Sequence, residues 1–261
     1  AVMRAAADHL TPCIMELSGC DAVVVDASAD LDLAARSIAF GLTFNGGATC
    51  IGPRRVLIPK DLQSDLISRL RDQIKDAAMP LHPVAVDGFI KTVSRSLSEG
   101  ANLSIGTFDP EAVRTDCCTG ALVLSEVDSS MATASADVFG PVLSIMPVED
   151  LDQAVSIVND CPYGLAASVF GRASEIQTIA NQLRVGHVSL NDIIVPTADP
   201  RVTFGGHRRS GFGVTRGREG LLAMTRPRVI SRRRGPLRMH LRPRREGDTE
   251  MLTKAAKWMS P

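Results

Sequence analysis

Short apolar strings alternate with longer stretches of helical periodicity along most of the chain. In the first string, residues 22–25, three consecutive valines are typical of a strand buried on both faces. Asp30 follows, and the apolar residues after it recur at the three- and four-residue spacing of a helix that buries one face. The pattern predicts strands at 22–25, 56–58, 142–145, 169–170 and 188–190, and helices at 30–42, 61–78, 89–97, 149–159 and 173–184. This alternation indicates an α/β fold with a mostly parallel sheet flanked by helices.

Two parts of the chain give weaker signals. Prolines and glycines interrupt residues 80–135, where only residues 89–97 have a helical pattern. The stretch after Ile230 has little periodicity, and we expect an arm or a disordered tail there.

The composition is that of a globular protein with one unusual cluster of charge. Of the 261 residues, 44% are hydrophobic and 22% are charged, and the net charge is zero. No apolar run reaches the length that spans a membrane, so we expect no membrane partner. Residues 226–245 contain nine arginines and no acidic residue, a pattern that could bind nucleic acid through its phosphates. Because no aromatic residue is interleaved with these arginines, we favour an oligomerisation arm followed by a solvated tail.

The cysteines indicate a reducing compartment and no metal centre. The six cysteines show no paired spacing of zinc-site type, and the five histidines are scattered. Cys117 and Cys118 are adjacent, which would strain a disulfide between them. We therefore expect a cytoplasmic protein without a structural metal.

The candidate chemistry centres on Cys50, which follows the glycine pair Gly46-Gly47, and on Glu16, thirty-four residues upstream. A thiol on a glycine-rich bend gives an electrophile room for close approach, and a carboxylate can activate water. Together they could form and hydrolyse a thioester. We expect Cys50 to be the most reactive of the six thiols, with its pKa lowered by a following helix. The alternative is an inert buried cysteine, since most cysteines are of that kind.

These residues belong to a longer series of motifs. The series runs Glu16-Leu17-Ser18-Gly19, Phe44 to Cys50, Asp137-Val138-Phe139-Gly140-Pro141, Tyr163-Gly164-Leu165, Asn191, and Ser210-Gly211-Phe212-Gly213 with Gly217-Arg218-Glu219-Gly220. In order and spacing, residues 10 to 230 resemble the catalytic half of the NAD(P)-dependent aldehyde dehydrogenases. The resemblance is strong at both ends of this range and weak between 80 and 130.

The resemblance implies a role for each motif. Cys50 would be the nucleophile that forms a thiohemiacetal and then a thioester with an aldehyde, and Glu16 the general base for the hydrolytic water. The nicotinamide end of NAD or NADP would lie against Asp137 and Phe139, and the substrate mouth would include Asn191 and Phe212. Three positions depart from the usual pattern. Where the family has two glycines and a lysine, this chain has Ser18, Gly19 and Cys20, and Asp137 replaces a glutamate.

The resemblance also implies a domain plan. Residues 1–19 would end a cofactor-binding domain that normally precedes Glu16, and 20–220 would form the catalytic domain. Residues 221–235 would carry an oligomerisation strand, with Thr225 to Ser231 pairing with a second copy, and 236–261 a basic, flexible tail. We therefore expect a homo-oligomer that oxidises a small aldehyde to a carboxylic acid. Two alternatives remain open: a non-catalytic remnant or interaction subunit, and a cofactor-free thiol esterase.

Overall fold

A computed structural model of the chain describes residues 1–232, 241, 243 and 245–259. The chain divides into two compact units, Ala1–Thr225 and Arg226–Pro261. In the second unit, residues 226–232 adopt no helix or strand, and Asp248–Met259 form helix α9. The sequence pattern did not indicate this helix. The assembly strand expected at Thr225 to Ser231 needs a second copy as its partner, so it stays a prediction.

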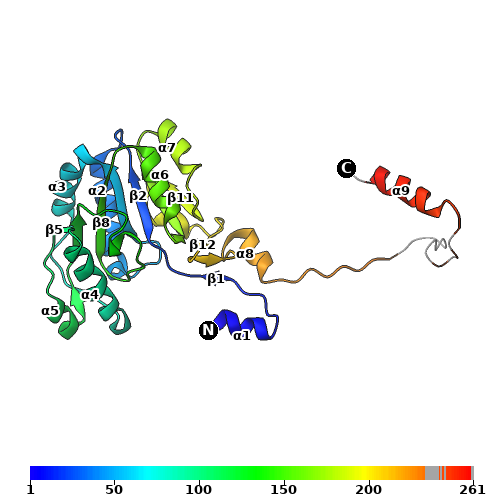
Figure 1. Cartoon of the computed structure of the whole chain (residues 1–261), viewed down its shortest axis with the longest axis horizontal. Helices are drawn as coiled ribbons and strands as arrows, with labels where there is room; N and C mark the ends of the chain where they lie inside the picture. The colour runs from blue at the N-terminus through cyan, green and yellow to red at the C-terminus, as the bar shows by residue number, and fades with distance from the viewer. Residues whose placement is uncertain (233–240, 242, 244, 260–261) are drawn as a thin grey trace. The chain divides into compact units, whose positions relative to one another are not determined.

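A seven-stranded sheet forms the centre of the first unit, in the order β11-β10-β2-β3-β8-β7-β5 (Figure 1). Five of its six neighbouring pairs are parallel, and only β5 and β7 pair antiparallel. The prediction of a mostly parallel sheet flanked by helices is therefore confirmed. The strands are β2 Asp21–Val25, β3 Pro53–Pro59, β5 Asn102–Ile105, β7 Leu122–Ser125, β8 Val142–Val148, β10 Ala166–Phe170 and β11 His187–Leu190.

All five predicted strands and all five predicted helices are present, with shifted ends. The helices are α2 Leu31–Thr43, α3 Gln63–Gln73, α4 Pro83–Ser98, α6 Leu151–Asp160 and α7 Ala173–Ala180. The prediction for α3 ran five residues too far, because the chain leaves the helix at Ile74 to reach the short strand β4 (Met79–Pro80). The elements missed between 80 and 135 include β5, β7 and the helix α5 (Pro110–Asp116).

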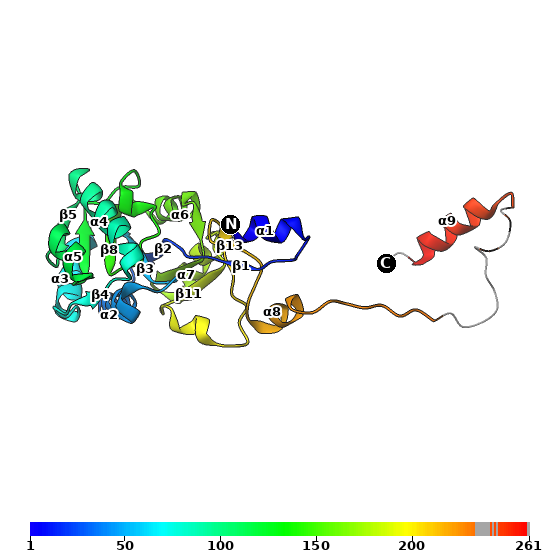
Figure 2. The ribbon, with the colours of Figure 1, turned by 90° about the horizontal axis from the view of Figure 1, so that it is seen from below.

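The sheet is buried because its side chains alternate between two apolar layers. Val23, Val25 and Val56 face one layer, which is closed by α2 and α3. Val24 and Leu57 face the opposite layer, which is closed by α4, α6 and α7. Figure 2 shows the helices distributed over both faces of the sheet. Burial on both faces explains why these strands read as continuous apolar runs.

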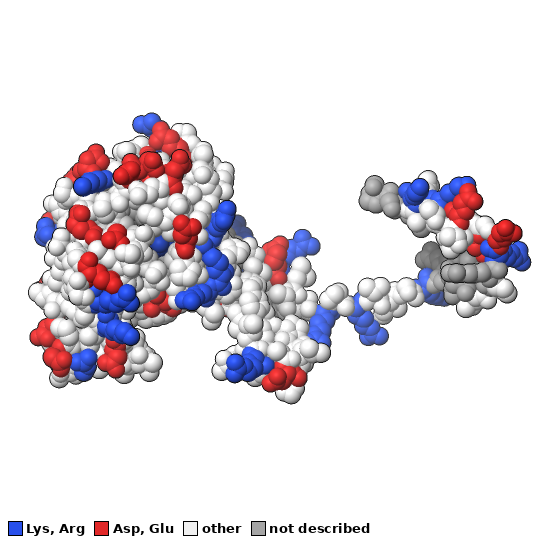
Figure 3. Space-filling model, in the orientation of Figure 1, with Lys and Arg blue, Asp and Glu red and all other residues white. Residues whose placement is uncertain are grey.

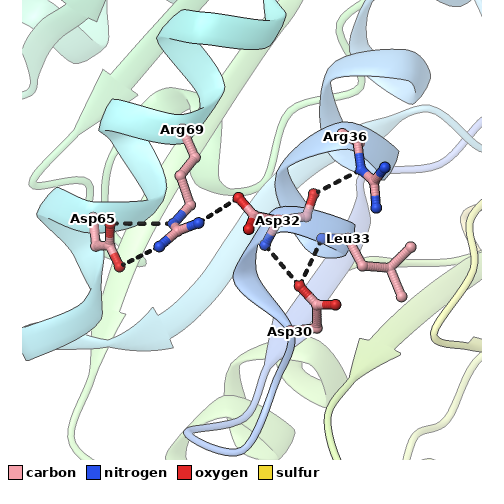
Figure 4. Close-up of polar contacts among 6 residues, drawn as sticks. All are labelled: Asp30, Asp32, Leu33, Arg36, Asp65 and Arg69. Carbon is pink, nitrogen blue, oxygen red and sulfur yellow. Dashed lines mark hydrogen bonds and ion pairs between the residues drawn. The ribbon is translucent and has the colours of Figure 1, made fainter.

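Helix α2, which leads to Cys50, is fixed at its start and along its side (Figure 4). The Asp30 carboxylate accepts hydrogen bonds from the backbone N–H groups of Asp32 and Leu33, both at 3.0 Å, and so caps the helix. Arg69 on α3 bonds Asp65 at 3.1 Å and also reaches Asp32 on α2. Since these ion pairs are exposed, they orient the two helices more than they stabilise them.

Short ribbons complete the first unit. Strand β1 (Met15–Glu16) pairs with β13 (Gly211–Phe212), β9 (Tyr163–Gly164) with β12 (His207–Arg208), and β4 with β6 (Cys118–Thr119). The remaining helices are α1 Val2–Asp8 and α8 Gly217–Ala223. On the face shown in Figure 3, acidic and basic side chains are interspersed over this unit. No helix within the described ranges is long and apolar enough to cross a bilayer.

Candidate active site

Cys50, Glu16 and the Phe139 motif lie at the amino edge of the central sheet. Cys50 lies three residues before β3, and the Phe139-Gly140-Pro141 motif ends directly before β8. Because β3 and β8 are parallel neighbours, the segments that lead into these two strands lie side by side. Open α/β sheets usually bind ligands at the carboxyl edge, so the use of the amino edge is a distinctive property of this site.

The loop that carries Cys50 is built on three consecutive left-handed residues. Helix α2 ends at Thr43, and Asn45, Gly46 and Gly47 have φ of 52°, 63° and 73°. Asparagine and glycine tolerate this conformation better than other residues. The expectation that the glycines end the helix and that Cys50 emerges from the following loop is confirmed. A Cβ on Gly47 would lie 2.6 Å from the carbonyl carbon of Gly140, so the two motifs touch backbone to backbone.

Replacing Gly47 with Ala should destabilise the first unit by about 3 kcal/mol, since the methyl group meets backbone atoms and φ is unfavourable. A thermal melt should show a midpoint lower by roughly 10 °C. Gly88→Ala is the matched control, because a Cβ at that exposed position in α4 has nothing within 4 Å. It should stabilise the helix by up to about 1 kcal/mol. Equal melting temperatures for the two variants would contradict the contact between the motifs.

Arg54 fixes the same loop by hydrogen bonds to its backbone. This role was not predicted from the sequence. Its Nη2 donates hydrogen bonds to the carbonyl oxygens of Gly47 at 2.8 Å and Thr49 at 3.0 Å. The side chain is only 3% exposed, and burial lowers the pKa of its guanidinium group. The sequence did contain a signal for this role, because two adjacent arginines directly precede a strand that is predicted to be buried. Arg54 is a positioning residue for the turn that presents Cys50.

Glu16 reaches Cys50 through the β1–β13 ribbon, in which it pairs with Gly211. A Cβ on Gly211 would lie 1.8 Å from the carbonyl oxygen of Met15, so glycine is required for this pairing. The Glu16 carboxylate interacts with the Cys50 thiol. Burial, and then the charge of Glu16, raise the pKa of Cys50 to about 11.

The expectation of a lowered Cys50 pKa is therefore wrong for this state of the chain. Residues 50–52 form a turn that leads into β3, so no helix begins beside the thiol. The backbone N–H of Ile51 donates to the sulfur and favours the thiolate, but burial and the carboxylate outweigh it. Cys50 rests as a neutral thiol.

The other side of Cys50 is apolar. The thiol packs against a cluster formed by Ile51, Leu165, Ala166 and Phe204. Phe204 is buried, and the guanidinium carbon of Arg216 lies 4.6 Å from its ring centroid. The sequence reasoning missed Phe204, although Gly205-Gly206 directly after it is a signal of close backbone packing. This cluster places an apolar surface beside Cys50, and an apolar substrate group could pack against it.

Asp137 and Ser18, which both depart from the motif pattern, are in direct contact. The Ser18 hydroxyl donates to Asp137 Oδ1 at 2.6 Å. Asp137 is exposed and Phe139 is half-buried. A carboxylate accepts up to about four hydrogen bonds, so Asp137 retains acceptor capacity for the hydroxyl groups of a ligand. These two motifs are therefore joined at the same edge of the sheet.

The two residues expected at the substrate mouth have different positions. Asn191 follows β11 at the carboxyl edge, opposite to Cys50, and its amide bonds the backbone N–H and carbonyl of Gly171, both at 3.0 Å. This geometry gives Asn191 a structural role and corrects the expectation. Phe212 lies in β13 beside the Glu16 strand, is 47% exposed, and lines an open groove of about 420 Å³ with Gly205 and Gly206. In the part of the chain that the structure describes, no cluster of three His, Cys, Asp or Glu residues could hold a metal.

Comparison with known proteins identifies relatives of the whole first unit. The profile described as "Aldehyde dehydrogenase family" matches residues 1–230. "Aldehyde dehydrogenase family 3 member A2" of Mus musculus is 33% identical over 224 residues, which are 83% of this chain and 46% of that protein. The NADP-dependent glyceraldehyde-3-phosphate dehydrogenase of Bacillus halodurans, solved with NADP, aligns with a TM-score of 0.78 and 28% identity over 87% of this chain and 49% of its own. The Mycobacterium tuberculosis aldehyde dehydrogenase, solved with NAD+, aligns with a TM-score of 0.74 and 29% identity over 84% of this chain and 48% of its own. The chain thus spans about half the length of the relatives it matches.

Proposed function

The chain belongs to the aldehyde dehydrogenase family, and we propose that Cys50 and Glu16 perform the covalent steps by which an aldehyde becomes a carboxylic acid. One observation carries this proposal. A carboxylate and a thiol that are 34 residues apart and lie on different elements come close enough for the charge of Glu16 to raise the pKa of Cys50. A carboxylate charge beside a thiol raises the thiol pKa and so works against reactivity. The arrangement is explained if the carboxylate acts in a later step, when it activates water to attack the carbonyl carbon that is bound to Cys50.

In the proposed mechanism, the Cys50 thiolate adds to the carbonyl carbon of the aldehyde and forms a thiohemiacetal. The backbone of the Cys50 loop, held by Arg54, orients the sulfur for this attack. Once the carbon is oxidised to the thioester level, Glu16 accepts a proton from a water molecule that adds to the thioester carbonyl. The carbon–sulfur bond then breaks, the acid is released, and Cys50 leaves as the thiolate.

Asp137 and Phe139 are the residues that fit the nicotinamide end of a dinucleotide. When bound, NAD+ or NADP+ supplies the acceptor for the hydride of the thiohemiacetal. Asp137 would accept hydrogen bonds from ribose hydroxyl groups, while Ser18 orients the carboxylate through their bond of 2.6 Å. Because aspartate is one methylene shorter than the usual glutamate, a bridging water could complete this contact. Relatives solved with NADP and with NAD+ support either cofactor.

The proposal extends to the partners of the chain. The substrate is a small aldehyde whose apolar part packs against Phe204 and the groove beside Phe212. The second partner is another copy of the chain, bound through Thr225 to Ser231, where Val229 and Ile230 are strongly exposed. We propose a cytoplasmic location, in keeping with six free cysteines.

The direct test is acylation of the purified chain with p-nitrophenyl acetate, followed by peptide mapping. The acetyl group should appear on Cys50. The rate should rise about tenfold per pH unit from pH 7 to 9, because a thiol with a pKa of about 11 gains thiolate in proportion over that range. Cys50→Ser should abolish the labelling and Cys13→Ser should not. Acetylation of another cysteine, or none, would favour a non-catalytic subunit, and ester turnover unaffected by NAD+ together with no aldehyde oxidation would favour a thiol esterase.

A further inference from the structure

Arg216 and Cys50 lie against the same small apolar cluster. The guanidinium carbon of Arg216 lies 4.6 Å from the ring centroid of Phe204, and Phe204 belongs to the cluster against which Cys50 packs. The backbone of Phe204 is fixed, because its carbonyl oxygen accepts hydrogen bonds from the N–H of Thr215 at 2.8 Å and from the Thr215 hydroxyl at 3.2 Å. The structure therefore places a cation at the border of the apolar surface beside the nucleophile.

A second contact connects Arg216 to a cavity beside Cys50. Nη1 of Arg216 donates a hydrogen bond to the carbonyl oxygen of Thr197, which is buried. Thr197 lines a narrow cavity together with Ile51, the residue after Cys50. Ile194 lines this cavity as well and packs against the same cluster as the thiol. Arg216 is thus bonded to one wall of a cavity whose other wall directly follows the nucleophile.

Most of the hydrogen-bonding capacity of Arg216 is free. A guanidinium group has five N–H donors, and among the described residues only the bond from Nη1 to Thr197 uses one of them. No aspartate or glutamate in the described ranges lies within ion-pair distance of Arg216. The edge formed by Nε and Nη2 is therefore available. Such an edge can bind a carboxylate through two parallel hydrogen bonds.

The titratable groups near Arg216 do not neutralise its charge. Asp199 is bonded to Arg201 at 2.6 Å, and this contact lowers the pKa of Asp199 to about 2. Burial raises the pKa of Asp21, which also lines the cavity, well above its usual range. Burial, and then the charge of Arg216, lower the pKa of His187, a further residue of the cavity wall. At neutral pH the positive charge at this end of the cavity is therefore that of Arg216.

We propose that Arg216 makes the site selective for aldehydes that carry a carboxylate at the far end of an apolar chain. The aldehyde carbon would lie at Cys50, the apolar chain would pack against Phe204, and the carboxylate would bind the free edge of Arg216. The proposal rests on the function proposed for Cys50 and adds the class of substrate. In it, Arg216 is a specificity-determining residue.

Glu16 sets a lower limit on the length of such a substrate. Its carboxylate is close enough to Cys50 for its charge to raise the pKa of the thiol. A substrate carboxylate attached directly to the aldehyde carbon would meet this like charge. Several methylene groups between the two ends remove the carboxylate from Glu16, and each one that is buried beside Phe204 contributes to binding. The half-aldehyde of a longer dicarboxylic acid is therefore favoured over one in which the two groups are adjacent.

The test compares two activated esters that differ only in charge. Mono(4-nitrophenyl) adipate has a free carboxylate, and 4-nitrophenyl methyl adipate has a neutral methyl ester in its place. Each is mixed at pH 8 with the purified 261-residue chain, release of 4-nitrophenol gives the rate constant of acylation, and peptide mapping locates the label on Cys50. The ratio of the two rate constants, anionic over neutral, measures the selectivity. It should be about 10 or more in the wild-type chain, as expected of a charge-assisted pair, and should fall with added NaCl.

Three variants assign the selectivity to one side chain. Arg216→Gln should lower the ratio by about 10- to 100-fold, while continued acylation by the neutral ester shows that the variant is folded. Arg216→Lys should retain part of the selectivity, because the ammonium group keeps the charge but lacks the planar fork. Arg218→Gln removes the same charge from an exposed residue of α8 and should leave the ratio unchanged.

The outcomes separate this proposal from the function on which it rests. If Cys50 is acylated by both esters and the wild-type chain shows no preference for the anionic one, the selectivity is overturned and the chemistry at Cys50 stands. The same conclusion follows if Arg216→Gln leaves the ratio unchanged, or if it slows both esters equally, since Arg216 would then act only by fixing Phe204. If neither ester acylates Cys50 in the wild-type chain, the proposed function is contradicted and the selectivity with it.

Discussion

Glu16→Gln should leave the acetyl group on Cys50, with deacylation slower by about 10² to 10⁴-fold. Glutamine cannot accept the proton of the hydrolytic water at any pH in the physiological range. Acylation should become faster at pH 8, because the variant removes a carboxylate charge that raises the pKa of Cys50. The two half-reactions should thus change in opposite directions. Stopped-flow release of p-nitrophenol and mass spectrometry of the acetylated chain would measure them separately.

A control for this variant lies at the opposite edge of the sheet. Glu149 is exposed and directly follows β8, so Glu149→Gln changes the net charge equally without touching the site. It should acylate and deacylate at the wild-type rates. If Glu16→Gln deacylates as fast as the wild-type chain, Glu16 is not the general base, even if Cys50 is the nucleophile.

The central sheet could be predicted because its strands are buried on both faces. Apolar runs such as Val23-Val24-Val25 carry that signal directly. Strand β5 lacks it, because it is an antiparallel edge strand with a register shift between Leu103 and Ile105. Its residues are only partly buried, so neither alternation nor a continuous apolar run appears. The helices were predicted correctly because each packs one apolar face against the sheet. Their ends were not, because the ends depend on where the chain turns towards the next element.

The sequence motifs predicted which residues belong to the candidate site, but they did not predict the pKa of Cys50 or the contacts of Arg54. The pKa of Cys50 depends on burial and on a charge delivered by a ribbon between Glu16 and Gly211, and this pairing has no local sequence signal. Arg54 could not be assigned because its partners are backbone carbonyls. The misplacement of Asn191 was avoidable. Cys50 precedes a predicted strand and Asn191 follows one, and in a parallel sheet these positions lie at opposite edges.

The last prediction concerns how much of a dinucleotide these 261 residues hold by themselves. Asp137 and Phe139 would contact the nicotinamide riboside. Adenosine and pyrophosphate usually lie on a glycine-rich turn at a helix N-terminus that follows a strand, and the described residues contain no such arrangement with the fingerprint spacing. We therefore expect NAD+ and nicotinamide mononucleotide to bind this polypeptide about equally weakly, with Kd of about 1 mM or more. Aldehyde oxidation by the polypeptide alone should be correspondingly slow.

Calorimetric titration of the polypeptide with both compounds decides the point. Asp137→Ala should weaken both equally, because the contact lies in the half that they share, and Asp87→Ala should be without effect as an exposed carboxylate on α4. The ratio of the two dissociation constants is the informative quantity, since it cancels whatever the riboside half contributes. If NAD+ binds more than about tenfold tighter than the mononucleotide, these residues hold the adenosine half as well. In that case the dinucleotide uses a surface other than the glycine turn, and the Asp137 motif is only one end of it.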